Sequence, residues 1–211
     1  MTSNKPRITE LRPNAQNPEL RDVYVDDTFY LSAPLLLLRE QELSVGSPFG
    51  EEEQSALLLA AQLIPAKEKA YQYLGYGDLS RAKLYEKLTR FGIEPKVAEL
   101  TCDYMEQRGY IDDTALAHKL ARRFAESKRW GRRRIMPELM QKGIPADAAR
   151  EAVDALDTDF YETARYHVET KYRRYDRSDR KERDKVFQGL LRLGFDFEEA
   201  KAALSIEDYD D

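Results

Sequence analysis

Five basic side chains surround the sole tryptophan of the chain in the stretch KRWGRRR, residues 128–134. The chain as a whole is acidic, with 34 Lys and Arg against 39 Asp and Glu and a formal net charge of −5. Residues 108–142 nevertheless hold ten Lys and Arg against four Asp and Glu. Cationic groups at this density attract phosphates and clustered carboxylates, so the sequence predicts a surface for a polyanion or an acidic protein. The name basic cluster is used below for Lys128, Arg129, Arg132, Arg133 and Arg134.

Catalytic and metal-binding patterns are missing from the sequence. His118 and His167 lie outside any HExxH spacing, and Cys102 has no second cysteine with which to form a disulfide or a zinc site. GYG at 75–77 lacks the lysine and the Ser or Thr of a phosphate loop, and no G-x-S-x-G motif is present. We therefore expect no enzymatic activity, no cofactor, no metal and no small-molecule substrate.

Length and composition indicate thin helical elements with a large solvated surface. The chain has 211 residues, of which 42% are hydrophobic and 35% charged, and its mean hydropathy is −0.70. The lone cysteine suits a reducing compartment, and no apolar run fits a signal peptide or a membrane span. We expect a soluble, cytoplasmic monomer that does not bind membranes.

The first 64 residues predict a small α+β extension. Apolar residues alternate along RDVYVDDTFYLSA on both sides of the turn-prone pair Asp26 and Asp27, and ITEL precedes them. This pattern is typical of a β-hairpin or meander. PLLLLREQEL and EEEQSALLLAAQLI predict two short helices that cover the strands, and the character of the sequence changes at Pro65.

An internal period of 51 residues follows Pro65. Gly92, Gly143 and Gly194 occupy similar settings in LTRFGI, LMQKGI and LLRLGF, and apolar positions align at the same shift without a gap. Each unit contains three amphipathic stretches, which predict three helices. Each glycine follows the second helix, where a left-handed C-terminal cap is expected. Ser80 is expected to cap the second helix of the first unit.

These observations predict a mainly α fold with three tandem three-helix repeats, preceded by the small N-terminal β-hairpin or meander with its short helices. Repeats too small to bury their own apolar faces are expected to stack into a curved, elongated rod with a long concave face. The expected segments are the extension 1–64, repeat 1 at 65–108, repeat 2 at 109–157, and repeat 3 at 158–211 with an acidic C-terminal tail.

On the second helix of repeat 2, the arginines of the basic cluster are expected to point to different sides. With Ile135 and Leu139 as its buried stripe, Arg132 shares the buried side, whereas Arg133 and Arg134 project outward. We therefore expect Arg133 and Arg134 to be the better contact residues.

Arg132 aligns with an arginine in each of the other two repeats, Arg81 and Arg183. An arginine in every unit favours a scaffold role over partner binding, for example by pairing with carboxylates of the next repeat. Pro137 falls inside the same helix, where it removes a backbone donor, so we expect an irregular first turn there.

Trp130 and Lys142 each have two interpretations. Trp130 is either a plug between helices or a contact hot spot. Lys142 takes the place that Phe91 and Leu193 have in the other repeats, so it either reaches solvent or contacts a partner.

A second basic stretch, KYRRYDRSDRKERDK at 171–185, has eight basic and four acidic residues. Tyrosines interleaved with arginines could stack on single-stranded bases. The 51-residue shift, however, places Tyr172 and Tyr175 on the buried stripe, and charges that alternate in sign are typical of a solvated face. We therefore predict that both tyrosines belong to the core.

Several of these stretches together resemble the RecX family, bacterial regulators of the RecA recombinase. They are YLGYGDLSRAKLYEKLTRFGI, GYIDDTALAHKLARRF, WGRRRIMPELMQKGI and KVFQGLLRLGFDFEEAKAAL. The resemblance covers about residues 66–205, and the N-terminal strands resemble an extension carried by some members. Arg132 stands where the family commonly has proline, and Pro137 where it commonly has a polar helix former. The positions that match the family pattern are Gly109, Tyr110, Asp112, Asp113, Gly131, Ile135, Glu138, Leu139, Lys142, Gly143 and Ile144.

The resemblance implies repeats that lie in the groove of a RecA filament on single-stranded DNA and inhibit or dismantle it, a role in regulating recombination, DNA repair and the SOS response. A basic stripe on a neutral body agrees with a groove that mixes acidic protein and phosphate. The residues leave open a stand-alone, non-specific DNA-binding helical repeat protein and, more weakly, a passive scaffold. The residues expected to bind the partner are Lys128, Arg129, Trp130, Arg133, Arg134, Lys142, Arg122 and Arg123.

Overall fold

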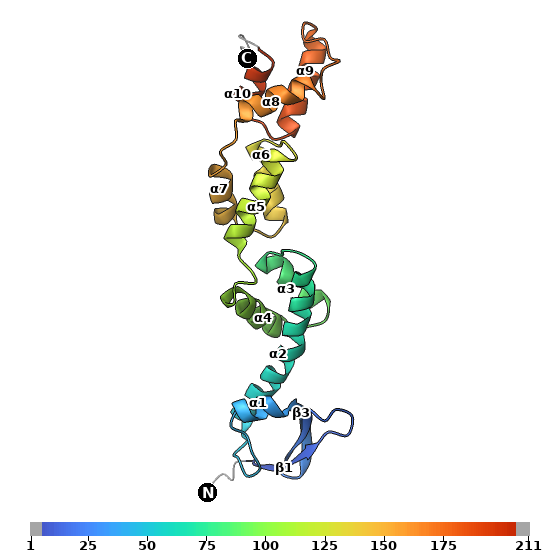
Figure 1. Cartoon of the computed structure of the whole chain (residues 1–211), viewed down its shortest axis with the longest axis vertical. Coiled ribbons are helices and arrows are strands. Elements are labelled where there is room, and N and C mark those ends of the chain that lie inside the picture. Colours follow the sequence, from blue (N-terminus) through green and yellow to red (C-terminus); the bar gives the residue numbers. More distant parts are fainter. Residues whose placement is uncertain (1–5, 206–211) are drawn as a thin grey trace. The chain divides into compact units, whose positions relative to one another are not determined.

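The computed structural model describes residues 6–205, and within that range it has three β-strands and ten α-helices (Figure 1). Helices dominate, as the hydropathy pattern predicted, and the strands are confined to the N-terminal region. None of the helices in this range combines the length and the apolar character that crossing a lipid bilayer requires.

An antiparallel sheet of order β1-β2-β3 forms the N-terminal region, which confirms the predicted meander. Its strands are Ile8–Pro13 (β1), Leu20–Val25 (β2) and Thr28–Pro34 (β3). Asp26 and Asp27 make the tight turn between β2 and β3 with φ angles of 45° and 65°. Aspartate is one of the few residues that tolerate this left-handed conformation, which matches the twist of a hairpin.

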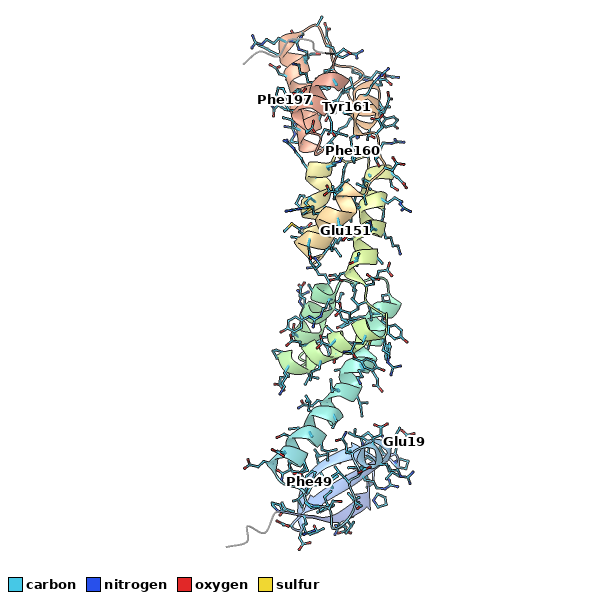
Figure 2. All side chains as sticks on the ribbon, turned by 90° about the vertical axis from the view of Figure 1, so that its left-hand side faces the viewer. Glu19, Phe49, Glu151, Phe160, Tyr161 and Phe197 are labelled. Atoms are coloured by element: carbon cyan, nitrogen blue, oxygen red, sulfur yellow. The ribbon has the colours of Figure 1, made fainter. Side chains whose placement is uncertain are left out.

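The sheet buries one face against α1 (Leu35–Glu40) and the start of the next helix. Ile8, Val23 and Leu57 are almost completely buried there. Phe49, labelled in Figure 2, is fully buried and contacts the Tyr30 ring edge-on, with 5.5 Å between ring centroids. These contacts form a small core of their own.

Helix α2 (Glu51–Gly75) is longer than the sequence predicted. The second short helix was expected to end before Pro65, but α2 continues through Pro65 for 25 residues and joins the extension to repeat 1. A proline inside a helix costs about 3 kcal/mol. Leu57 on one side of Pro65, and Ala66 and Ala70 on the other, are buried, and their burial offsets that cost.

The remaining helices form the three-helix units that the 51-residue period predicted. The second half of α2 is followed by α3 (Arg81–Arg90) and α4 (Pro95–Gln107) in repeat 1. Repeat 2 contains α5 (Asp113–Glu126), α6 (Arg132–Gln141) and α7 (Ala146–Asp154). Repeat 3 contains α8 (Phe160–Glu169), α9 (Arg180–Arg192) and α10 (Phe197–Ala203). In all three repeats the second helices end, and the third helices begin, 51 residues apart.

The predicted glycine caps are confirmed. Gly92, Gly143 and Gly194 have φ angles of 101°, 81° and 94°, the left-handed conformation that a residue without a β-carbon adopts at low cost. The predicted N-cap of α3 is also present, since the Ser80 hydroxyl oxygen accepts a hydrogen bond from the Lys83 backbone N–H at 3.2 Å.

Pro137 does not break α6, which is helical from Arg132 onward with Pro137 inside it. The expected irregularity is limited to the Gly131 carbonyl, which accepts from the backbone N–H groups of both Arg134 and Ile135.

Repeat 3 departs from the gap-free alignment in its first helix. Helix α8 ends at Glu169, so Tyr172 and Tyr175 lie in the connection to α9 and not on the helix. Tyr172 is half-buried and packs against the core, but 39% of Tyr175 is exposed. The prediction that Tyr175 belongs to the core is therefore wrong.

The chain divides into two compact units. One contains the described residues up to Tyr76 together with Lys87–Met105, and the other contains Gly77–Glu86 and the described residues from Glu106 on. The second unit has a continuous core that runs through repeats 2 and 3 and includes Ile135, Leu139 and Leu190. The predicted curvature and elongation of the stacked repeats stay a prediction. The predicted acidic tail falls on residues 206–211, outside the described residues.

Candidate interaction surface

The basic cluster occupies the connection between α5 and α6 and the first turn of α6. Arg129 has a φ of 53°, which turns the chain sharply after α5. The Trp130 backbone N–H then donates to the Phe124 carbonyl at 3.2 Å, so the connection folds back onto the end of α5. Gly131 caps the N-terminus of α6 in an extended conformation.

Main-chain hydrogen bonds join this part of repeat 2 to repeat 3. The Gly131 N–H donates to the Leu193 carbonyl at 2.9 Å, and the Arg133 N–H donates to the Gly194 carbonyl at 3.0 Å. A β-carbon on Gly131 would lie 2.2 Å from the main-chain carbonyl atoms of Gly194, closer than real β-carbons come. Only glycine therefore allows this contact, which is called the backbone joint below.

The 51-residue shift places a related contact at the start of α3. Ser80 corresponds to Gly131, and its hydroxyl donates to the Lys142 carbonyl at 2.8 Å, where Lys142 corresponds to Leu193. The second helices of repeats 1 and 2 thus both contact the glycine cap of the next repeat where they begin, through a side chain at Ser80 and through main-chain atoms at Gly131.

Arg132 has the scaffold contacts that the alignment predicted. Its Nη1 lies 3.1 Å from Oε1 of Glu199 in the next repeat, and its guanidinium lies 4.0 Å from the centre of the Phe160 ring. Phe160 and Phe197 begin the two helices of repeat 3 that present these partners (Figure 2). The Glu199 side chain is only 4% exposed, and burial raises its pKa.

The aligned arginines of the other two repeats, Arg81 and Arg183, make different contacts from Arg132. Arg81 Nε lies 3.5 Å from Oε2 of Glu106, within repeat 1. The Nε of Arg183 is buried and makes no hydrogen bond to a described residue. Arg132 pairs with the next repeat through its side chain, whereas at Arg81 the backbone N–H donates to Oδ1 of Asp113 in repeat 2 at 2.9 Å.

Trp130 is a plug between helices that also supports a cation. Its half-buried ring packs against Phe124 with 5.1 Å between centroids. The guanidinium of Arg134 lies 4.0 Å from the centre of the Trp130 ring, and Arg134 Nε lies 3.9 Å from a Glu138 oxygen. Arg134 therefore projects outward less freely than predicted, because it is stacked and half-buried.

Arg129 and His167 mark the side of the cluster that faces repeat 3. The Arg129 guanidinium lies 4.0 Å from the centre of the Tyr166 ring, and its carbonyl oxygen lies 2.8 Å from His167 Nε2. The carbonyl can only accept, so Nε2 carries the proton. Burial lowers the pKa of His167, and the nearby charges of Lys171 and Arg129 lower it further.

Lys128, Arg133 and Lys142 are exposed, and none of them forms an ion pair with a described residue. They do not form one patch, however. Arg133 lies in the first turn of α6 and Lys142 follows its last residue, and a ten-residue helix is about 15 Å long. The structure therefore brings Lys128 and Arg133 together near one end of α6 and leaves Lys142 at the other.

Arg122 and Arg123 line a shallow depression of about 540 Å³ on α5. His118, Lys119 and Glu126 line it as well, and sequence reasoning did not select the first two as contact residues. Their i, i+4 relation to the two arginines was the available signal. Lys119 is paired, since its Nζ lies 2.6 Å from an Asp78 oxygen.

The described residues contain no group of three or more His, Cys, Asp or Glu that could hold a metal ion. The surface instead offers guanidinium and ammonium groups on a scaffold fixed by the backbone joint. Such a surface can bind carboxylates and phosphates.

Comparisons with known proteins identify similar chains. Family models for the first, second and third three-helix domains of RecX match residues 66–105, 112–153 and 157–204. The chain is 31% identical over 200 residues to the regulatory protein RecX of Clostridioides difficile, covering 94% of each chain. It is 32% identical over 152 residues to that of Vibrio campbellii, covering 72% of this chain and 97% of the relative.

Solved structures share the fold. A crystal structure of regulatory protein RecX aligns with a TM-score of 0.72 at 21% identity, covering 96% of this chain and 100% of that one. A crystal structure of RecX from Lactobacillus salivarius aligns with a TM-score of 0.62, also at 21% identity, covering 69% of this chain and 96% of that one.

Proposed function

Because the chain belongs to the RecX family of regulatory proteins, we propose that it binds the filament that the RecA recombinase forms on single-stranded DNA and inhibits the ATPase and strand-exchange activities of that filament. The partner is a mixed surface of acidic protein and nucleic-acid phosphate. The contacts come from the exposed cations of repeat 2.

The observation that carries this proposal is that the side chains of the basic cluster have two different roles. Arg132 and Arg134 are held by Glu199, Glu138 and aromatic rings, and they stabilise the scaffold. Lys128 and Arg133 are exposed beside them and form no ion pair with a described residue, although the Arg133 charge also acts on Glu199. Exposed cations on a fixed scaffold lose little entropy when they meet an anionic surface.

The protein inhibits by occupying a surface of the filament and not by catalysing a reaction. A protein without a catalytic pattern can slow an ATPase only by binding a surface that the ATPase must move or expose. Binding of this kind is steered by charge, so it weakens as salt rises.

The test is the rate of ATP hydrolysis by RecA on single-stranded DNA with increasing amounts of the protein. We choose Lys128→Glu/Arg133→Glu as the variant, because reversal of Arg134 would also remove its stacking on Trp130. The matched control is Lys96→Glu/Arg150→Glu, which reverses two exposed cations outside the surface.

Wild type and control should inhibit alike, and the variant should need at least about tenfold more protein for the same inhibition. An unchanged hydrolysis rate with stoichiometric wild-type protein would refute the proposal. If variant and wild type inhibited ATP hydrolysis equally, Lys128 and Arg133 would not be part of the binding surface.

A further inference from the structure

The connection between α8 and α9 has a fixed shape. We call residues 170–181 the basic loop; it includes the first two residues of α9. Tyr172 anchors it, because its ring lies so close to Gly189 in α9 that a β-carbon there would come within 2.4 Å of the Tyr172 hydroxyl oxygen. The Tyr172 backbone N–H donates to the His167 carbonyl, and the Tyr175 N–H donates to the Tyr172 carbonyl.

The acidic residues of this region are engaged by the backbone of the loop. Asp176 accepts from the Ser178 N–H at 2.9 Å and from the Ser178 hydroxyl at 2.7 Å, and these bonds lower its pKa. Asp179 accepts from the Glu182 N–H at 2.9 Å and caps α9. Glu182 in turn accepts from the Asp176 N–H at 2.6 Å. These carboxylates shape the loop and do not pair with its cations.

The cations of the basic loop are left facing solvent. All six are exposed, and none forms an ion pair with a described residue. Within twelve residues the loop holds these six cations and only the carboxylates of Asp176 and Asp179, so it repels cations and attracts anions. The cations are Lys171, Arg173, Arg174, Arg177, Arg180 and Lys181.

Tyr175 adds an aromatic surface among these charges. It is 39% exposed, and its ring meets the anchored Tyr172 ring edge-on with 5.9 Å between centroids. Arg174 precedes it and Arg177 follows two residues later. An exposed aromatic ring between cations is the combination on which single-stranded bases stack while their phosphates are neutralised.

We propose that the basic loop of repeat 3 is a binding site for single-stranded nucleic acid, in which Arg173, Arg174 and Arg177 contact phosphates and Tyr175 stacks on a base. The loop binds without base specificity, because guanidinium groups and a phenol ring recognise phosphates and any base face. This inference does not rest on the proposed function, since it concerns binding in the absence of a recombinase.

A nucleic acid fits this loop better than an acidic protein. The carboxylates of an acidic protein would pair with the cations, but they would not stack on the exposed ring of Tyr175. The loop also lies next to the basic cluster, because His167 contacts both: its Nε2 donates to the Arg129 carbonyl, and its own carbonyl accepts from the Tyr172 N–H. A strand on the loop would therefore run next to the surface proposed to face the filament.

The first experiment measures fluorescence anisotropy of a labelled oligothymidylate with the full-length protein and without recombinase. Arg173→Glu/Arg174→Glu/Arg177→Glu should bind at least about tenfold more weakly than wild type. Its slope of log affinity against log salt should be smaller by about 2, since each phosphate contact on a single strand contributes about 0.7. The control Arg39→Glu/Lys96→Glu/Arg150→Glu, which reverses three exposed cations elsewhere, should match wild type.

The second experiment isolates the stacked ring. Tyr175→Ala should weaken oligothymidylate binding by about tenfold, whereas Tyr175→Phe should retain it. An oligonucleotide of abasic sites, which has phosphates and no bases, should bind wild type and Tyr175→Ala equally.

Oligothymidylate affinity of the triple variant equal to that of wild type would overturn the proposal. So would equal competition by polyglutamate, because that result assigns the loop to an acidic protein. The proposed function fails separately, because Lys128 and Arg133 lie outside the basic loop: Lys128→Glu/Arg133→Glu should lose inhibition but lose less oligothymidylate affinity than the triple variant. Circular dichroism of each variant is the check that its helices are retained.

Discussion

At the scale of single residues, His167 carries a pH dependence that can be predicted. Burial lowers its pKa below the ordinary value of 6.5. Below that pH the unfolded chain takes up a proton that the folded chain does not, so the free energy of unfolding should fall as the pH is lowered. We expect a lower urea midpoint at pH about 5.5 than at pH about 7.5.

His167→Gln is the matched control for this prediction. Glutamine can still donate to the Arg129 carbonyl but takes up no proton in this range. The difference between the two midpoints should therefore shrink in the variant. Equal pH dependence of His167→Gln and wild type would assign the effect to other groups.

Side-chain roles were predictable where the helix that carries them was predictable. The scaffold role of Arg132 followed from the arginine aligned in every repeat, and Glu199 of the next repeat is its partner, although 46% of the Arg132 side chain is exposed and not buried as predicted. The stacking of Arg134 on Trp130 did not follow, because it depends on the turn at Arg129 that brings the two rings of the plug together. Tyr175 was assigned to the core because no signal in the sequence marks the end of α8 at Glu169.

At the scale of elements, the backbone joint predicts an unusual sensitivity at Gly131. Gly131→Ala would place a β-carbon 2.2 Å from main-chain atoms of Gly194, and backbone cannot rotate away as a side chain can. We expect a loss of about 3 kcal/mol in the free energy of unfolding, measured with urea.

Gly92→Ala is the comparison that separates collision from backbone strain. Gly92 has a φ of 101° but open space around its missing β-carbon, so alanine there should cost only about 1–2 kcal/mol. A Gly131→Ala variant no less stable than Gly92→Ala would contradict the contact at the joint.

The sequence predicted elements well where periodicity alone determines them. The period of 51 residues located the glycine caps and the ends of the second helices, since each is set by local backbone chemistry. The prediction that a helix ends before Pro65, which rested on the proline itself, failed because the burial of Leu57 and Ala70 outweighs the local cost of a proline in α2. Local propensity contains no information about such tertiary contacts.

At the scale of the whole molecule, separate cores predict separate responses to mutation. Phe49 belongs to the N-terminal core and Leu190 to the core of repeats 2 and 3. Phe49→Ala should cost about 3–5 kcal/mol and reduce amide hydrogen-exchange protection in β1–β3. Protection in α8–α10 should stay unchanged.

Leu190→Ala provides the reciprocal test and should cost about 2–5 kcal/mol. Amide hydrogen-exchange protection should decrease in α8–α10 and stay unchanged in β1–β3. A uniform loss across the chain in either variant would mean that the two cores unfold as one.

The joint between repeats 2 and 3 also bears on how such a chain can diverge. Amides and carbonyls are common to every residue type, so the main-chain contacts of this junction require particular residues only at the pair Gly131 and Gly194 and place little requirement on the side chain of an exposed neighbour such as Arg133. Outward side chains can then be exchanged over generations while the register between neighbouring modules is kept. One architecture can in this way acquire new specificities through changes at its surface, while the joints between its modules stay the same.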